Sequence, residues 1–290
     1  MLVMSGLWEE TSFIMKKYHV KANKSLGQNF LIDENVINKI VDCSDIKKDD
    51  CVIEIGPGLG TLTKELLEKA GEVVCVELDK KMIPILEDRF ALYKNFELVN
   101  DDILKIDLKK LIDEKKNKGF KEIKIVANLP YYITTPIIMK LLEDKLDLKS
   151  ITVMVQKEVA DRLIAVPGDK ETGAITYSVY YYAEGEKILE VPKDSFIPEP
   201  EVISEVIKLN IRKEPPVKVE RPDVMFRVIK CAFMQRRKTL LNALVNTRVF
   251  LNKEEGMKVL KKLNLNENVR AENLTLQNFA NITRYITICS

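Results

Sequence analysis

The sequence has few of the residues on which metal centres, disulfides and many catalytic sites depend. Its 290 residues include a single histidine, His19, and five scattered cysteines that form no Cys-x-x-Cys pair. Metal sites and disulfide frameworks are therefore not expected, and reduced, mostly buried thiols are the default. A Ser-His-Asp or Cys-His site would have to form around His19, in a basic N-terminal segment, and we discount it. The cysteines are Cys43, Cys51, Cys75, Cys231 and Cys289.

Long hydrophobic runs are missing as well. No apolar stretch approaches the roughly 20 residues that a membrane-spanning helix needs. Residues 1–8 are apolar but lack a basic leader and a long apolar centre, so they make a poor signal peptide. With 46% apolar and 31% charged residues, the chain is expected to be a globular, cytoplasmic protein without a membrane partner. It is long enough for one substantial domain and a smaller one.

The net charge of +2 hides an uneven distribution. Residues 209–290 carry 16 Lys and Arg against 7 Asp and Glu, whereas the other 208 residues carry 30 against 37. Such asymmetry favours an anionic partner for the basic part, with nucleic acid as the first candidate, although a helical surface can be basic without binding anything. Glu214-Pro-Pro216 interrupts the chain, so we divide it into domains of residues 1–211 and 212–290.

The first domain begins with the pattern of a βαβ unit around a glycine-rich turn. An apolar strand over residues 51–55 carries Glu54 and leads into Gly56-Pro-Gly58-Leu-Gly60. After a helix, a second strand ends at Glu77-Leu78, where Glu77 is placed to accept hydrogen bonds from both hydroxyls of a ribose. The turn lacks the further glycine of the dinucleotide fingerprint, and nicotinamide and flavin enzymes have the same need for glycine, so it is weak evidence alone.

The next predicted strand indicates which ligand the glycine-rich turn binds. It covers residues 96–99 and ends on Asn100-Asp-Asp102-Ile103, where an acid can bond to an adenine amino group. The order of glycine-rich turn, ribose acid and adenine acid describes an S-adenosylmethionine pocket better than a pyrophosphate pocket.

The stretch with the most specific chemistry is Asn128-Leu129-Pro130-Tyr131, which follows an apolar strand over residues 123–126. Proline fixes its own φ and drives the preceding residue into an extended conformation, so the loop should be stiff. Open α/β sheets place their binding sites at this end of a strand. A strand-to-helix turn capped by asparagine would also explain these residues, so their neighbours have to decide.

These residues suit methylation of an adenine amino group. That amine is a poor nucleophile because its lone pair is delocalised into the ring. The Asn128 side-chain oxygen and the Leu129 carbonyl can both accept its N–H bonds and so favour a pyramidal nitrogen. Tyr131 can stack on the base, a contact worth about 1–3 kcal/mol in single-strand recognition.

Two polar segments have both a structural and a functional interpretation. Residues 25–31, which include Gln28, Asn29 and Phe30, form either a connector or a lid that faces a ligand. Arg236, Arg237 and Lys238 fall at the start of a predicted helix over residues 237–246, as a solvated face or as contacts to backbone phosphates. Helices are also predicted over residues 8–18, 223–233, 253–263 and 276–288, whereas residues 174–183 mix helix and strand signals and stay unassigned.

Together the motifs resemble those of the ribosomal RNA adenine dimethyltransferases of the KsgA type. The resemblance covers nearly the whole chain, from residues 24–33 through Val155–Arg162 and Phe196–Pro200 to Phe233–Lys238. It implies an α/β fold, a Rossmann-like class I S-adenosylmethionine methyltransferase sheet with a small all-helical C-terminal domain. It also implies a monomer that transfers four methyl groups to the N6 atoms of two adjacent adenosines near the 3′ end of 16S rRNA in the immature 30S particle.

The predicted site follows from the motifs and from this resemblance. Transfer would be direct and in line, without a metal or a covalent intermediate, because the sulfonium is already activated. One departure is Tyr132, where many family members have asparagine. The predicted catalytic residues are Asn128, Leu129, Pro130 and Tyr131. The predicted cofactor-binding residues are Gln28, Asn29, Leu31, Glu54, Gly56, Gly58, Gly60, Glu77, Leu78, Asp102, Ile103 and Asn128. The predicted RNA contacts are Phe30, Tyr131, Arg236, Arg237 and Lys238.

Three alternatives stay open at this point. The nearest is an adenine methyltransferase that acts on large-subunit rRNA and gives macrolide resistance, against which Phe196–Pro200 and Gln235–Lys238 argue. A second is a ribosome-assembly factor that contributes mainly by binding. A nicotinamide oxidoreductase is the third, and the Asn128–Tyr131 loop argues against it.

Overall fold

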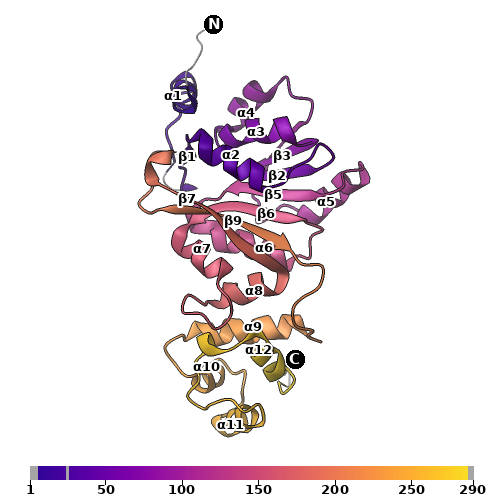
Figure 1. Ribbon diagram of the computed structural model, residues 1–290, viewed down its shortest axis with the longest axis vertical. Helices are drawn as coiled ribbons and strands as arrows, with labels where there is room; N and C mark the ends of the chain where they lie inside the picture. Colours follow the sequence, from indigo (N-terminus) through magenta and orange to yellow (C-terminus); the bar gives the residue numbers. More distant parts are fainter. Residues whose placement is uncertain (1–5, 24–25, 287–290) are drawn as a thin grey trace. The chain divides into compact units, whose positions relative to one another are not determined.

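The computed structural model describes residues 6–23 and 26–286 and divides into two compact units (Figure 1). Unit 1 comprises Met1–Ala160 and Gly185–Ile211, and unit 2 comprises Asp161–Glu184 and Arg212–Ser290. The chain therefore enters unit 2 twice, and the second entry falls at the predicted boundary of residues 211 and 212. Predictions that involve Lys24, Ser25 or Cys289 lie outside the described residues.

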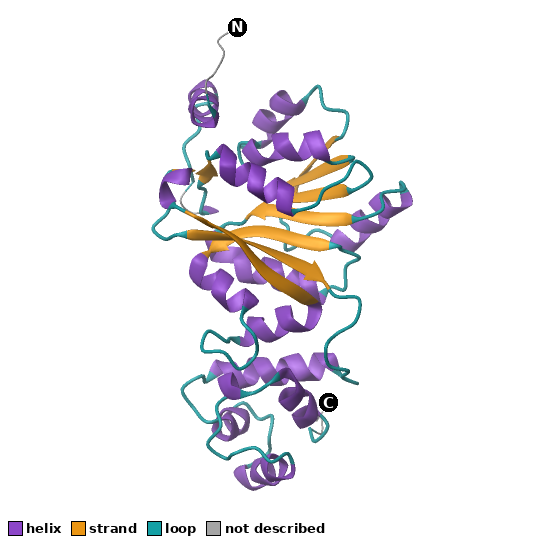
Figure 2. Ribbon diagram, in the orientation of Figure 1, coloured by secondary structure: helices purple, strands orange, loops and turns teal. Residues whose placement is uncertain are grey.

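Unit 1 is built on a seven-stranded sheet in the order β4-β3-β2-β5-β6-β9-β7 (Figure 2). The first five strands in this order are parallel, and β9 runs antiparallel to β6. The central strands are mostly apolar and almost entirely buried, as expected for a parallel sheet with helices on both faces. The strands are β2 (Cys51–Ile55), β3 (Glu72–Glu77), β4 (Phe96–Asn100), β5 (Ile123–Asn128), β6 (Ser150–Gln156), β7 (Ala183–Val191) and β9 (Ser204–Ile211).

Helices α2 and α3 lie on one side of this sheet and α6 on the other (Figure 1). This arrangement confirms the predicted Rossmann-like α/β fold. Within the sheet and the helices beside it, α4 and β7 were not predicted, and the sequence of β7 is too polar and exposed to indicate a strand. The helices of this part are α2 (Glu34–Cys43), α3 (Thr61–Lys69), α4 (Ile83–Phe90), α5 (Leu108–Asn117) and α6 (Thr134–Glu143), while α7 (Lys157–Ile164) begins in unit 1 and ends in unit 2.

The N-terminal segment is attached to unit 1 by buried apolar side chains and by several polar contacts, including the ion pair between Glu10 and Arg89. Helix α1 (Leu7–Lys17), predicted over residues 8–18, begins where the Leu7 N–H donates to the Glu34 carboxylate at 3.0 Å. Residues 26–31, which we call the lid, then contribute β1 (Phe30–Leu31), which pairs antiparallel with β8 (Phe196–Ile197). The lid is therefore connected to the Phe196–Pro200 motif by backbone hydrogen bonds.

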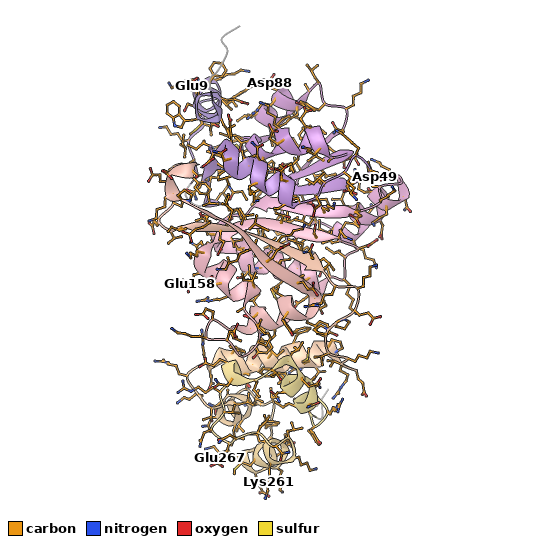
Figure 3. All side chains as sticks on the ribbon, in the orientation of Figure 1. Glu9, Asp49, Asp88, Glu158, Lys261 and Glu267 are labelled. Carbon is orange, nitrogen blue, oxygen red and sulfur yellow. The ribbon has the colours of Figure 1, made fainter. Side chains whose placement is uncertain are left out.

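Unit 2 is helical, with α8 in the segment that the sequence left unassigned. The buried Tyr177 of α8 explains this membership, because its hydroxyl donates to the Leu274 carbonyl at 2.6 Å and its ring meets Phe279 edge-on. Charged side chains such as Lys261 and Glu267 are exposed on this unit, as Asp88 is on unit 1 (Figure 3). The helices are α8 (Ala174–Tyr182), α9 (Pro222–Met234), α10 (Leu240–Asn246), α11 (Lys253–Lys262) and α12 (Leu276–Thr283).

Two helix boundaries in unit 2 correct the sequence predictions. Helix α10 begins at Leu240 instead of residue 237, because the Thr239 hydroxyl accepts from the Asn242 N–H and caps the helix there. Helix α12 ends at Thr283 instead of residue 288. Among the described residues, no helix is long and apolar enough to cross a membrane.

Candidate active site

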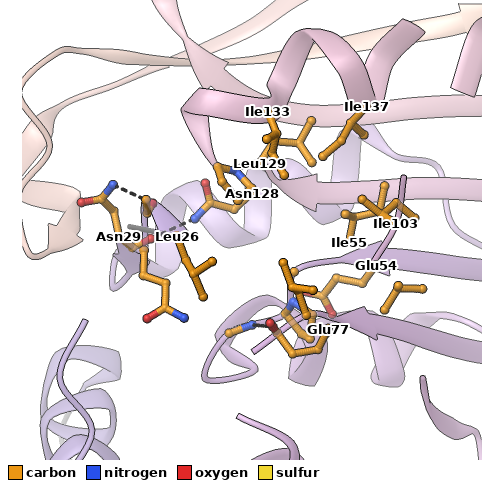
Figure 4. Close-up of a pocket in the computed structure, with 18 of the residues that line it drawn as sticks. Leu26, Asn29, Glu54, Ile55, Glu77, Ile103, Asn128, Leu129, Ile133 and Ile137 are labelled. Carbon is orange, nitrogen blue, oxygen red and sulfur yellow. Dashed lines mark hydrogen bonds between the residues drawn. The ribbon is translucent and has the colours of Figure 1, made fainter. Parts of the chain in front are cut away.

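A single pocket of unit 1 collects most of the predicted site residues (Figure 4). It lies at the carboxyl ends of β2, β3 and β5 and holds about 1030 Å³ of space, including the open solvent at its mouth. Its walls come from the lid, the glycine-rich turn and the loops after three strands. Its lining includes Gln28, Asn29, Phe30, Leu31, Glu54, Gly56, Gly58, Glu77, Leu78, Asp102, Ile103, Asn128, Leu129, Pro130 and Tyr131.

The glycine-rich turn is held against the acid at the end of β3. Glu77 accepts hydrogen bonds from the Gly58 N–H at 3.1 Å and the Asp79 N–H at 2.7 Å. Gly58 adopts a φ of +58°, and a Cβ there would lie 3.2 Å from the Phe30 ring, so a side chain would be strained and crowded. Burial raises the pKa of the Glu77 carboxyl.

The wall beyond Glu77 combines apolar surface with a second acid. Leu78 is partly exposed and Ile103 is buried, and both line the pocket, so they offer apolar surfaces to a flat purine ring. One Asp102 oxygen accepts from the Leu104 N–H at 3.0 Å and stabilises the turn after β4. The structure therefore brings the predicted ribose and adenine acids to the same pocket.

Glu54 is the most deeply buried acid of the pocket lining, at 2% exposure. Its carboxylate accepts hydrogen bonds from the Thr63 hydroxyl at 2.6 Å and from the Cys75 thiol at 3.4 Å. Burial outweighs these hydrogen bonds and raises the pKa of Glu54 to about 7. Near neutral pH this carboxyl is therefore divided between its two protonation states.

Asn128 is oriented by the lid. Its Nδ2 donates to the backbone carbonyl of Asn29 at 3.1 Å, a contact between residues 99 positions apart (Figure 4). The Leu129 N–H donates to the Met154 carbonyl at 3.2 Å. Among the described residues, neither Asn128 Oδ1 nor the Leu129 carbonyl has a hydrogen-bond partner. Two acceptors at the pocket are thus available for the two N–H bonds of an amine.

The turn after Leu129 presents two tyrosines at the pocket. Pro130 has the extended ψ that ends the strand, and its carbonyl accepts from the Thr134 hydroxyl at 3.0 Å. The Tyr131 hydroxyl lies 2.6 Å from Ser204 Oγ, and burial raises the pKa of this tyrosine. Tyr132 is 54% exposed, and its ring lies beside Gly27 of the lid, where a Cβ would approach it to 3.3 Å.

Several predicted residues lie elsewhere or have partners already. Gly60 is outside the pocket lining, and it is glycine because a Cβ there would meet the Phe90 ring at 2.6 Å. The Gln28 amide donates to Asp79 at 2.9 Å, which anchors the lid. Phe30 is buried against Gly58, so it faces the glycine-rich turn. Arg236, Arg237 and Lys238 belong to unit 2, in the turn between α9 and α10.

The pocket also contains residues that the sequence did not single out. Leu26 and Gly27 line it from the lid, and Thr61, Leu62, Ile133 and Ile137 line it from the helices that follow the glycine-rich turn and the Asn128 loop. Each is a close neighbour of a predicted motif, so adjacency was the available signal.

Comparisons with known proteins bear directly on this pocket. A family model described as ribosomal RNA adenine dimethylase matches residues 19–287. The chain is 50% identical over 277 residues to ribosomal RNA small subunit methyltransferase A of Alkaliphilus metalliredigens, with 96% of each chain covered. It is 47% identical to the protein of the same name in Clostridioides difficile, over 95% of this chain and 94% of the other.

This chain belongs to the ribosomal RNA adenine dimethylase family. It is an S-adenosylmethionine-dependent rRNA adenine dimethyltransferase, as the motifs predicted.

Solved structures agree on the fold. A dimethyladenosine transferase from Plasmodium falciparum superimposes with a TM-score of 0.70 at 27% identity, covering 87% of this chain and 95% of the other. The 23S rRNA methyltransferase ErmE gives 0.65 at 22% identity, with 89% and 99% covered, and shows a shared fold. The alternatives of an oxidoreductase, a large-subunit enzyme or an assembly factor alone are not favoured.

The raised pKa of Glu54 predicts how pH affects stability. The folded protein holds the Glu54 proton up to about pH 7, whereas an unfolded glutamate loses it near 4.5. Stability should therefore fall as pH rises through this window, because the folded state binds more protons. Glu54→Gln keeps an acceptor for Thr63 but has no proton to lose. Its free energy of unfolding minus that of the parent should therefore be about 3 kcal/mol larger at pH 8 than at pH 4. Urea unfolding of both proteins at the two pH values measures this, and a pH-independent difference would contradict it.

Proposed function

We propose that this protein transfers methyl groups to the N6 atoms of two adjacent adenosines near the 3′ end of 16S rRNA, within the immature 30S particle, and acts as a cytoplasmic monomer. The single observation that carries the chemistry is the pair of unpartnered oxygens, Asn128 Oδ1 and the Leu129 carbonyl, at the pocket. The relatives named for the small ribosomal subunit support the choice of substrate.

The catalytic contribution of the chain is to orient the amine and the base. S-adenosylmethionine supplies an activated methyl group when it is bound. Asn128 Oδ1 and the Leu129 carbonyl accept the two N–H bonds, which leaves the nitrogen lone pair free to point at that methyl. Holding the amine, the methyl group and the sulfur in line supplies most of the catalysis, because binding has already met the entropic cost of bringing them together. The proton that the amine loses passes to solvent, so no basic side chain is needed.

The donor would be held by the residues beside the glycine-rich turn. We assign Glu77 to the ribose hydroxyls and Asp102 to the adenine amino group, with Leu78 and Ile103 against the purine. Gly56 and Gly58 line the pocket without side chains and so leave room there for the methionine part. Asn29, Leu31 and Glu54 complete this wall, while Gly60 acts through packing against Phe90.

The RNA-binding role of unit 2 depends on its basic turn. The exposed Arg236 side chain already has partners within unit 2. It forms an ion pair with the Glu272 carboxylate at 3.0 Å and donates to the Lys170 carbonyl at 3.2 Å. Arg237 and Lys238 are exposed, and among the described residues neither has a side-chain partner. We therefore assign phosphate contacts to Arg237 and Lys238 and a structural role to Arg236.

Asn128→Ala should strongly lower the rate of methyl transfer, while the donor still binds through the remaining residues of its wall. Loss of one preorganised partner of the reacting group typically lowers the rate by about 100- to 1000-fold. The measurement is methyl transfer from labelled S-adenosylmethionine to unmodified small subunits, with donor affinity measured by calorimetry. Asn210→Ala, at the opposite end of the same sheet, is the matched control and should retain activity. Near-normal turnover by Asn128→Ala would refute the assignment.

Neutralising the basic turn should weaken particle binding in a salt-dependent way. For Arg237→Ala and Lys238→Ala, the plot of log affinity against log salt should become shallower. The magnitude of its negative slope should fall by about 0.7–0.9 for each lost phosphate contact. Binding to small subunits across a salt series measures the slope. Arg237→Lys keeps the charge and should keep the slope. An unchanged slope in the double alanine variant would remove these residues from the RNA interface.

A further inference from the structure

Both ends of the segment from Ser195 to Ser204 contact residues of the candidate site. The proposed mechanism assigns this segment no role. At one end, β8 pairs with the lid strand β1, and the Ile32 N–H donates to the Ser195 carbonyl at 2.9 Å. At the other end, Ser204 begins β9 and contacts Tyr131. The segment contains the Phe196–Pro200 motif, which the proposed mechanism does not use.

Sheet topology explains why Ser204 lies beside Tyr131 of the pocket wall. The parallel strands β5 and β6 end at the pocket edge of the sheet, with Asn128 opposite Met154. Because β9 is antiparallel to β6, its first residue lies at the edge where β6 ends, and Ser204 is paired with Gln156. A residue far along the chain therefore sits beside the loop that follows β5.

The contact itself is close and shielded from water. Ser204 is fully buried, and its Oγ lies 2.6 Å from the Tyr131 hydroxyl, within the range of a good hydrogen bond. Tyr131 is half-buried and lines the pocket. Its phenol is thereby tied at the far end of the ring, while the ring remains part of the pocket wall. The hydroxyl keeps its proton at neutral pH, because tyrosine ordinarily titrates near 10 and burial raises the pKa of Tyr131 further.

We propose that Ser204 is a positioning residue for the methyl transfer: its hydroxyl fixes the Tyr131 ring in the orientation that receives the target adenine. The inference rests on the proposed function, since it needs the base to stack on Tyr131. A tyrosine ring without this hydrogen bond could turn about its side-chain torsions, and the stacked amine would move with it. In-line transfer is sensitive to such movement, because a displacement of about 1 Å can lower a rate by about 100-fold.

The test is a double-mutant cycle in the full-length protein with unmodified small subunits and S-adenosylmethionine. Ser204→Ala and Tyr131→Phe each remove one partner of the hydrogen bond and keep the aromatic ring. Each should lower kcat by about tenfold, with little change in KM for the particle or in donor affinity. The double variant should be no worse than either single variant, since both remove the same interaction.

Ser150→Ala is the matched control, because Ser150 is equally buried at the opposite end of β6. It should retain kcat even if its melting temperature falls as far as that of Ser204→Ala. The inference is overturned if Ser204→Ala turns over normally while Tyr131→Phe is impaired, or if the two losses multiply. If Ser204→Ala does not fold, Ser204→Cys takes its place under the same criteria. A parent protein that fails to methylate small subunits would instead refute the proposed function.

Discussion

The hydrogen bond from Asn128 Nδ2 to the Asn29 carbonyl is the interaction on which the site depends. An amide side chain offers one donor end and one acceptor end, and the lid engages the donor end. The acceptor end is thereby left without a partner, beside the Leu129 carbonyl, and in the proposed function it receives the substrate amine. Without this contact the amide could present its N–H groups to the amine, and two donors would then face each other. The lid therefore orients the catalytic loop as well as lining the pocket.

The fold makes this arrangement possible by bringing five segments to one edge of a sheet. Parallel strands end together, so the glycine-rich turn, Glu77, the Asp102 turn and Asn128 meet without any long excursion of the chain. Backbone pairing of β1 with β8 then holds the lid over that edge. The two acids nearest the turn, Glu54 and Glu77, are both buried, and burial raises the pKa of each carboxyl.

The sequence predicted those parts of the site whose signals are local. The glycine-rich turn, the acids at strand ends and the Asn128–Tyr131 loop are each read within a few residues, and all reach the pocket apart from Gly60. The contacts that orient them are long-range: 99 positions separate Asn128 from Asn29, and 73 separate Tyr131 from Ser204. The helix and strand periodicity of a sequence carries no information on contacts between residues so far apart in the chain. The same holds for Tyr177, whose partners at Leu274 and Phe279 placed α8 in unit 2.

The most direct test of the central claim is a crystal structure with S-adenosylhomocysteine and an adenosine-containing RNA fragment bound. The account predicts the adenine N6 about 3 Å from both Asn128 Oδ1 and the Leu129 carbonyl, with Asn128 Nδ2 still bonded to the Asn29 carbonyl. An amine beyond hydrogen-bond reach of these two oxygens, or a sulfur atom bound away from this loop, would contradict it.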